Sequence, residues 1–483
     1  MRLRSCPFDW SAIVITLDLP EDIYLRREAC MKGKGLKCLM WLILALSAVA
    51  LVGETWAKPI VMVSGRWDNE MIFIDLAKAI EPASDGTDKA VVNRVRYTPD
   101  SPDGGPMGGQ AINVGIPPGS RFAYVIDHGC MTSAESKAFQ KGELIQHGYP
   151  GFLAVYNLKK ALDPANGGTL NAVETFIETG GYGAAGLAFT PDGKYALVGH
   201  AESKGSEDGG NLLSIIDLNT RQVVRKMNLK MGNPGFTCPP DPIPHAAPNP
   251  KWGCFPDTNG IVYSPVGGGY LFTGNGGTDD VSVVDVQQAL AGNPDAEIFR
   301  IPVQTGPFGM GVSPDGKYVV SANRESQRTE VEGNTISIID VQKAIAKAKD
   351  AEVARVLVGT NDPSAKSRPF APVFIHGGKR ILVSNFRSNN LSVVDVEKAI
   401  KGEPAEVARI PLVTPKNLGP SRPRGIAITA DGRYAAITGA PTKKGRGSSV
   451  VFIVDLDTLK VVGRVTGVGD EAYFLAVVPD DQL

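Results

Sequence analysis

Residues 308–358 read FGMGVSPDGKYVVSANRESQRTEVEGNTISIIDVQKAIAKAKDAEVARVLV, and this stretch decides the fold. It contains four apolar runs of strand length, FGMGVS, YVVSAN, ISIIDV and AEVARVLV, which turn or polar segments separate. The first separator has turn chemistry, because Pro314 presets its own φ, Asp315 bonds nearby backbone and Gly316 relieves the end of the turn. The stretch therefore predicts a sheet of four short antiparallel strands.

The same unit recurs along the whole chain. The phrase after the third strand is nearly constant in four copies, DLAKAI, DVQQAL, DVQKAI and DVEKAI, and an acidic cap before such residues predicts a single helical turn at the outer edge. A fixed repeat indicates one repeat architecture rather than several domains. The predicted third strands end at Asp75, Asn157, Asp217, Asp285, Asp340, Asp395 and Asp455.

The two ends of the repeat region complete each other. Residues 59–65 (PIVMVSG) have second-strand sequence with no first strand ahead of them, and residues 472–481 (AYFLAVVPDD) have first-strand sequence with nothing following. Pairing them completes a seventh unit and closes a ring, which leaves only short, protected sheet edges. We therefore predict an all-β fold, a seven-bladed β-propeller closed by strands from both ends, over residues 58–483.

Two pairs of strands carry a family resemblance. KYVVSAN followed by ISIID, and KRILVSN followed by LSVVD, resemble the YVTN-type β-propeller repeat, and the likeness extends over essentially all of residues 58–483. The resemblance implies the propeller fold. Related propellers include cell-surface proteins, lactonases and subunits of periplasmic oxidoreductases, so the resemblance selects no single function.

The N-terminal region has the pattern of a targeting leader. Lys32, Lys34 and Lys37 precede an apolar run at residues 39–52, and a small-residue cleavage site follows near Ala57. We expect residues 1–30 to be a non-native or cytoplasmic leader and residues 31–57 a signal peptide, with the propeller periplasmic, extracellular or on the cell surface. The apolar run is short for a membrane span, so membrane attachment would require an uncleaved leader.

Charge and cysteine content narrow the partners and cofactors. The chain has 50 Lys and Arg against 51 Asp and Glu, so no global field would recruit nucleic acid. Cys238 and Cys254 bracket a Pro-rich loop, and in an exported protein we expect them to form a disulfide, leaving Cys130. The sequence has no CxxCH motif, which excludes covalent c-type haem.

Candidate functional residues collect where second strands end and first strands begin. In a propeller both positions open on one end of the central axis, which we call the mouth. Asparagine at the end of a second strand also has a structural explanation, because it tolerates a left-handed backbone and can hydrogen-bond to the backbone of the loop. Arg368 and Arg422 come just ahead of first strands. The predicted ligand-binding residues at the mouth are Arg66, His128, His200, Glu202, Asn275, Asn323, Arg324, Asn385, Arg387 and Arg424.

Two kinds of chemistry remain open at the mouth. Periplasmic seven-bladed propellers such as nitrous oxide reductase hold copper with axial histidines, but this chain offers only His128 and His200, so copper is an alternative without a full ligand set. A lactonase-like hydrolase could use His200 with Glu202 as acid and base. No GxSxG, HExxH or P-loop motif supports an enzyme.

Long, charged loops follow several second strands, including the basic 441–449 and the acidic 202–210. Such loops on one face of a rigid ring favour a binding surface. We therefore expect an exported binding or scaffold protein that takes a protein partner or a small charged ligand at the mouth. The alternative is a periplasmic enzyme or enzyme subunit, hydrolase or metal-dependent oxidoreductase.

Overall fold

The computed structural model describes residues 59–98, 109–129, 151–201, 210–232, 254–326, 329, 331–415, 418–441, 445 and 447–479, all within one compact unit, Ala57–Leu483. The leader and its predicted boundaries lie outside the described residues, as do Cys130, Glu202 and Cys238. The signal peptide and the Cys238–Cys254 disulfide therefore stay predictions. None of the described helices is long and apolar enough to cross a bilayer.

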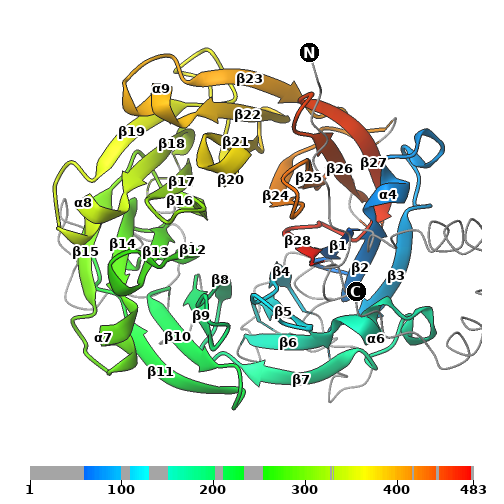
Figure 1. Ribbon diagram of the computed structural model, residues 1–483, viewed down its shortest axis with the longest axis horizontal. Coiled ribbons are helices and arrows are strands. Elements are labelled where there is room, and N and C mark those ends of the chain that lie inside the picture. Colours follow the sequence, from blue (N-terminus) through cyan, green and yellow to red (C-terminus); the bar gives the residue numbers. More distant parts are fainter. Residues whose placement is uncertain are drawn as a thin grey trace, which may run out of the picture. The chain divides into compact units, whose positions relative to one another are not determined.

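The described residues form seven four-stranded antiparallel sheets around a common axis, which confirms the seven-bladed propeller (Figure 1). The innermost strand of each sheet faces the axis and packs beside the innermost strands of its neighbours. These strands are β4 (Ala111–Gly115), β8 (Ala184–Phe189), β12 (Thr258–Ser264), β16 (Pro307–Val312), β20 (Pro369–Ile375), β24 (Pro423–Ile428) and β28 (Leu475–Val478).

The other strands of each sheet follow outward in chain order. The second strands are β1 (Ile60–Ser64), β5 (Phe122–Asp127), β9 (Tyr195–His200), β13 (Tyr270–Asn275), β17 (Tyr318–Glu325), β21 (Arg380–Asn385) and β25 (Tyr434–Gly439). The third are β2 (Glu70–Asp75), β6 (Phe152–Asn157), β10 (Leu212–Asp217), β14 (Asp280–Asp285), β18 (Glu332–Asp340), β22 (Asn390–Asp395) and β26 (Ser449–Asp455). The outer strands are β3 (Val91–Arg96), β7 (Val173–Glu178), β11 (Gln222–Asn228), β15 (Glu297–Pro302), β19 (Glu352–Leu357), β23 (Glu406–Pro411) and β27 (Lys460–Val468).

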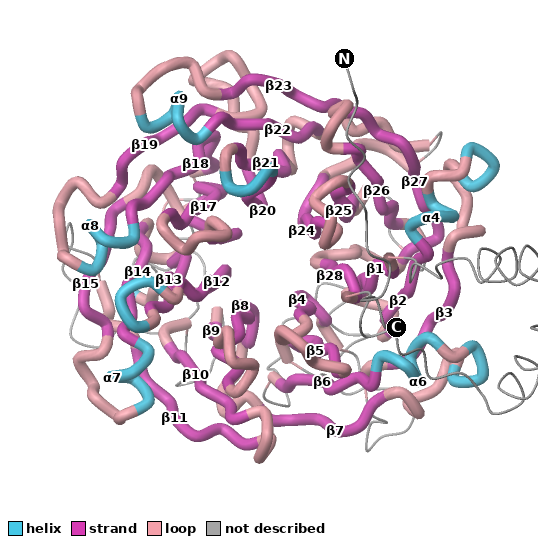
Figure 2. Tube along the Cα trace, in the orientation of Figure 1, coloured by secondary structure: helices cyan, strands magenta, loops and turns pink. Residues whose placement is uncertain are grey.

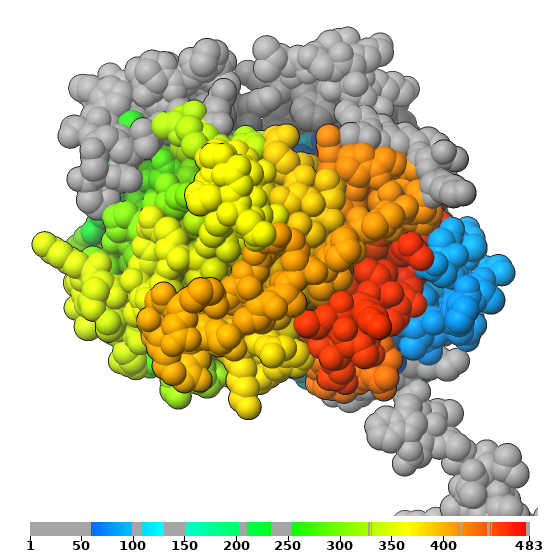
Figure 3. Space-filling view, turned by 90° about the horizontal axis from the view of Figure 1, so that it is seen from above, coloured from blue at the N-terminus to red at the C-terminus, as the bar shows by residue number. Residues whose placement is uncertain are grey.

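One sheet contains both ends of the described chain, in the order β28-β1-β2-β3. Strand β28 pairs antiparallel with β1, with Val478 opposite Ile60 and Leu475 opposite Val63. The predicted ring closure is therefore confirmed. In the space-filling side view, the red C-terminal segment lies against the blue N-terminal blade (Figure 3).

Short helical turns follow the third strands on the outside of the ring, as Figure 2 shows in cyan. In each, the Asp or Asn that ends the strand accepts a hydrogen bond from a backbone N–H three residues later, as Asp340 does from Lys343 at 2.9 Å. The capped turns predicted from the sequence are confirmed. They are α4 (Leu76–Ala79), α6 (Leu158–Leu162), α7 (Val286–Leu290), α8 (Val341–Ile345) and α9 (Val396–Ile400), and α6 uses Asn157 as its cap.

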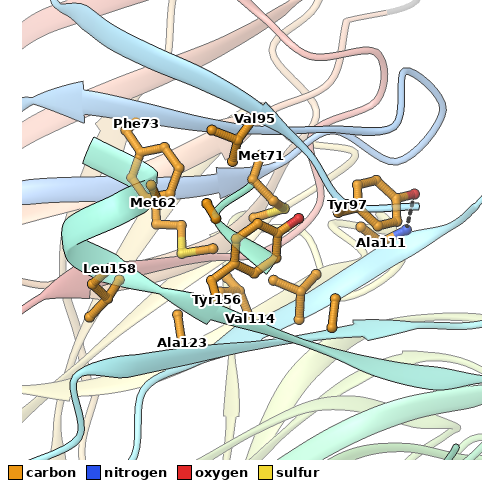
Figure 4. Packing of buried hydrophobic residues seen from close by; sticks show 14 of the residues in the cluster. Met62, Met71, Phe73, Val95, Tyr97, Ala111, Val114, Ala123, Tyr156 and Leu158 are labelled. Atoms are coloured by element: carbon orange, nitrogen blue, oxygen red, sulfur yellow. Dashed lines mark hydrogen bonds between the residues drawn. The ribbon is translucent and has the colours of Figure 1, made fainter. Parts of the chain in front are cut away.

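Apolar side chains fill the space between neighbouring blades. Figure 4 shows one such cluster, where Met62, Phe73 and Tyr156 from two adjoining sheets are fully buried together. The buried Tyr97 hydroxyl accepts a hydrogen bond from the Ala111 N–H at 2.9 Å, so its polar end is satisfied. Each large apolar side chain buried in this way contributes about 1.5–3 kcal/mol of transfer free energy.

Glycines allow the innermost strands to approach one another closely. A Cβ at Gly309 would lie 2.2 Å from the carbonyl oxygen of Phe370 in the next blade, and a Cβ at Gly260 would lie 2.2 Å from that of Phe308. The close approach explains why first strands such as GMGVS and GIVYS carry glycine: the radius near the axis is too small for side chains there. The backbone of neighbouring blades is thereby held in contact around the axis.

Candidate functional site

Six arginines from four blades meet at the mouth, and we call them the arginine cluster. Arg324 lies next to the end of β17, Arg424 lies in β24, and Arg66 and Arg387 follow β1 and β21. Arg368 and Arg422 stand directly before the prolines that begin β20 and β24, and both have positive φ, 53° and 45°. The innermost strands and the ends of the second strands therefore deliver guanidinium groups to the same place.

An aromatic cluster lies beneath the arginines, and we call it the aromatic floor. Phe308 and Phe370 from adjacent blades have ring centroids 4.6 Å apart. Tyr473, which precedes β28 in a third blade, lies 5.3 Å from Phe370 and 6.3 Å from Phe308. Phe386 and Phe474 also pack against Phe370, at 6.3 and 5.9 Å. Since Phe308 and Phe370 belong to innermost strands, the floor joins blades at the axis.

The guanidinium groups stand over the rings of this floor. Arg424 lies 4.5 Å from the Tyr473 centroid, and Arg324 lies 4.6 Å from that of Phe308. Both also approach Phe370, at 5.9 and 5.4 Å. Arginine stacked on aromatic rings is held in a fixed orientation with its N–H edge free to point elsewhere. Arg66 stacks on Trp67 and Tyr473, and Arg368, Arg422 and Arg424 stack around Phe386.

Among the described residues, three carboxylates form ion pairs with five of these six guanidinium groups. Glu471 contacts Arg424 at 2.5 Å and Arg66 at 3.6 Å. Glu332 contacts Arg368 at 3.0 Å and also Arg387, while Glu325 pairs with Arg368 and lies 3.6 Å from Arg324. The cluster therefore keeps an excess of positive charge after its own ion pairs are formed.

The electrostatic state of the cluster follows from burial. Desolvation lowers the pKa of Arg324 to about 10, Tyr473 and Glu325 oppose the shift, and the neighbouring charges of Arg368 and Arg424 add to it. Burial acts against the Glu471 carboxylate, but Arg424, Arg66 and the Trp67 indole N–H outweigh it and lower its pKa to about 2. Glu471 is thus anionic at every physiological pH.

Several donors of the cluster are buried without a hydrogen-bond acceptor. Arg424 is 7% exposed, and its Nε and Nη1 have no partner among the described residues. The Nε atoms of Arg324, Arg368 and Arg66 are also buried and have no hydrogen-bond partner among the described residues. Buried N–H groups of a charged side chain are normally satisfied, and an acceptor such as an anion could satisfy these donors.

His200 is hydrogen-bonded through both of its ring nitrogens. Its side chain is fully buried, its Nδ1 donates to the Tyr182 carbonyl at 2.7 Å, and its Nε2 accepts from the Ser214 hydroxyl at 3.0 Å. Burial lowers its pKa to about 4, against the backbone hydrogen bond to Tyr182. His128 is partly buried and lies 3.2 Å from the Ala184 carbonyl through Nδ1. Ligation by His200 would therefore break one of its existing hydrogen bonds.

The described residues contain no group of three His, Cys, Asp or Glu side chains placed to share a metal ion. Glu202, the predicted partner of His200, lies outside them. The predicted copper site and the His200–Glu202 pair therefore stay predictions.

Asn275, Asn323 and Asn385 are fully buried inside their own blades. Asn275 donates to Asp280 and Ser282 at 2.7 Å, and Asn385 donates to Ser392 at 2.8 Å. The expectation of left-handed backbone at these asparagines is wrong, because they lie in regular strands, and the positive φ falls on turn residues such as Asp279 and Asn389. Their side chains bond to the neighbouring strand rather than to the loop.

Sequence reasoning found the arginines but missed four of their partners, Glu332, Glu471, Phe386 and Tyr473. A local signal was available for the arginines: SRPF at residues 367–370 and SRPR at 421–424 occupy the same place in successive blades. Glu471 also precedes an innermost strand and has a positive φ like Arg368 and Arg422, but its segment (EAYF, 471–474) lacks the Arg-Pro pair, so this signal does not mark it.

No protein-family model matches this chain, and no curated protein sequence matches it. Solved structures do match in fold. A periplasmic gluconolactonase of Pseudomonas aeruginosa has a TM-score of 0.57 at 16% identity, covering 87% of this chain and 99% of that one. A functionally unknown protein from Desulfotomaculum acetoxidans has a TM-score of 0.52 at 15% identity with the same coverage. The chain is thus a seven-bladed propeller with distant structural similarity to lactonase-like, YVTN-type propellers.

Proposed function

We propose that this propeller is an exported binding protein for a small anionic ligand, which the arginine cluster holds over the aromatic floor. The observation that carries the proposal is the set of buried, unpartnered guanidinium N–H groups of Arg424 and Arg324, both within 6 Å of the Phe370 ring. One anionic group between them would accept from both arginines and relieve their mutual repulsion. Carboxylate and phosphate groups both have this chemistry.

A small ligand fits better than a flat protein surface because the free donors are buried. The 7% exposure of Arg424 requires an acceptor that enters between side chains, which an exposed acidic patch of a folded partner does not do. Periplasmic or extracellular location is part of the proposal and rests on the leader pattern of residues 31–57.

Lactone hydrolysis is the alternative that the fold likeness to a gluconolactonase suggests. A general base for hydrolysis should have a pKa near the working pH. Of the described mouth residues, Asp68 in the turn between β1 and β2 meets that condition with a pKa of about 7, whereas Glu471 and His200 do not. Glu471 has a pKa of about 2, and both ring nitrogens of His200 are engaged.

The test is binding of succinate and of inorganic phosphate to the mature protein by calorimetry, with and without Arg324→Met and Arg424→Met. Loss of a charge-assisted hydrogen bond to the ligand should weaken binding about tenfold or more. Arg355→Met, on outer strand β19 with 41% of its side chain exposed, is the matched control and should bind as the parent does. Arg387→Met, 54% exposed, provides a milder cluster variant if a buried substitution prevents folding.

Unchanged affinity in Arg324→Met and Arg424→Met, with both variants folded by circular dichroism, would contradict the proposal. The same samples are assayed for lactone hydrolysis. Specific turnover that disappears in Arg424→Met would replace the binding function with the hydrolase.

A further inference from the structure

Glu471 sits in a receptor that suits a carboxylate. One of its oxygens accepts from Arg424 Nη2 at 2.5 Å, and the other accepts from the Trp67 indole N–H and lies 3.6 Å from Arg66 Nη1. Two guanidinium groups and an indole N–H thus converge on two oxygens. The two oxygens of a planar carboxylate can accept from donors on both sides at once, whereas phosphate presents its oxygens tetrahedrally.

The three carboxylates of the cluster differ in how they are anchored. Glu325 and Glu332 lie opposite each other in the paired strands β17 and β18, so their positions follow from the sheet. Glu471 lies in the connection between β27 and β28, with a φ of 55°, a left-handed backbone that non-glycine residues seldom adopt. Its neighbours are fixed, since the Asp470 carbonyl accepts from the Trp67 N–H at 3.3 Å and the Ala472 N–H donates to Ser449 Oγ at 2.9 Å.

The Glu471 side chain is also 28% exposed, in contrast to the buried Arg424 that it covers. Rotation of this side chain toward solvent needs no change in the fixed backbone on either side. A carboxylate arriving from solution would then find the same donors, and the number of ion pairs in the receptor would stay the same.

We propose that Glu471 is an internal occupant of the ligand site, and that the ligand is a small carboxylic acid whose carboxylate takes the place of Glu471 on Arg424, Arg66 and Trp67. This inference rests on the proposed function and specifies it, because it selects carboxylate over phosphate. The position of Glu471 shares Arg424 with the anion position between Arg324 and Arg424, so succinate supplies one carboxylate to each position, whereas phosphate occupies the second alone. An occupied receptor lowers the apparent affinity by the fraction of molecules in which Glu471 has vacated it. Competition with Glu471 therefore favours carboxylate ligands and lowers their apparent affinity.

The experiment compares Glu471→Gln with Glu332→Gln, a matched variant that removes one charge from the same cluster. Succinate should bind about tenfold more tightly to Glu471→Gln, and less than about threefold more tightly to Glu332→Gln, because only the first removes the competitor. The affinity for inorganic phosphate should rise by the same factor in both variants. In the parent protein, saturating succinate should change Trp67 emission, phosphate should not, and the change should vanish in Trp67→Phe.

Equal gains for succinate in the two variants, or unaltered Trp67 emission at saturation, would overturn the exchange with Glu471 while leaving anion binding intact. Tighter binding of phosphate than of succinate to the parent protein would also overturn the assignment to carboxylic acids. If neither probe binds to the parent protein or to Glu471→Gln, the proposed function fails and the exchange fails with it.

Discussion

Asp68 is an acidic residue that the fold holds in an unfavourable environment. It lies in the turn between β1 and β2, beside the segment that closes the ring. Burial, with the charges of Glu70 and Asp470, raises its pKa to about 7, and backbone hydrogen bonds only partly oppose the shift. An acid whose pKa is raised in the folded state binds its proton more tightly there than in the unfolded chain.

The sign of the pH dependence follows from that difference. Below about pH 4 Asp68 is protonated in the folded and the unfolded state, so it does not change the free energy of unfolding. Between pH 4 and 7 Asp68 ionises first in the unfolded chain, so the free energy of unfolding falls as the pH rises. Asp68→Asn should therefore raise the free energy of unfolding by on the order of 2–4 kcal/mol at pH 8, and progressively less toward pH 4. Urea unfolding at pH 5 and pH 8 measures both values.

Asp295→Asn is the control for this prediction, because its side chain is 82% exposed. It should change stability by less than about 0.5 kcal/mol at both pH values. A gain in Asp68→Asn that is the same at pH 5 and pH 8 would show that the Asp68 carboxyl is not the source.

At the scale of single elements, the innermost strands combine two requirements. They need glycine where neighbouring backbones touch, as Gly309 touches Phe370, and they need large aromatic side chains one residue away, as at Phe308. The third and fourth strands instead carry polar pairs, such as Ser282 bonded to Glu297 at 2.7 Å. Glu297 also accepts a hydrogen bond from Arg300 at 2.7 Å, and the AEVAR-type phrase repeats this Glu–Arg spacing of three residues in later blades.

Gly309→Ala tests the close approach of β16 and β20. The added Cβ would meet the Phe370 carbonyl oxygen at 2.2 Å, and relief of such an overlap requires the two innermost strands to separate. We expect a loss of about 1–3 kcal/mol in unfolding free energy, with weaker succinate binding because Phe370 belongs to the aromatic floor. Chemical denaturation and calorimetry measure the two effects, and full stability of Gly309→Ala would mean that the blades are less tightly joined than described.

At the scale of the whole propeller, circular closure determines the site. Tyr473 and Glu471 reach the mouth only because β28 pairs with β1. Arg66, from the first described blade, and Arg424, from the last, share Glu471 as an ion-pair partner. The binding site and the ring closure are therefore one structural unit.

Deletion of residues 473–483 should abolish cooperative thermal unfolding, because it removes β28 and exposes the edge of β1. Ala476→Pro is a milder version, since it places a proline opposite Met62 within the closing pair and should lower the melting temperature without loss of the chain end. Differential scanning calorimetry measures both. An unaltered transition in the deletion variant would contradict the closure.

The sequence by itself determined the seven blades, the capped turns, the ring closure and the position of the arginines. These features are encoded locally, in turn residues such as Pro314 and Asp315, in the period-two alternation of strands, and in a unit repeated often enough to set its own register. Only the tertiary structure decided which of the candidate residues are accessible. It buried His200 and the three asparagines within blades and brought Glu471 to Arg66, more than four hundred residues away in the chain, because those contacts depend on how separate blades pack around one axis.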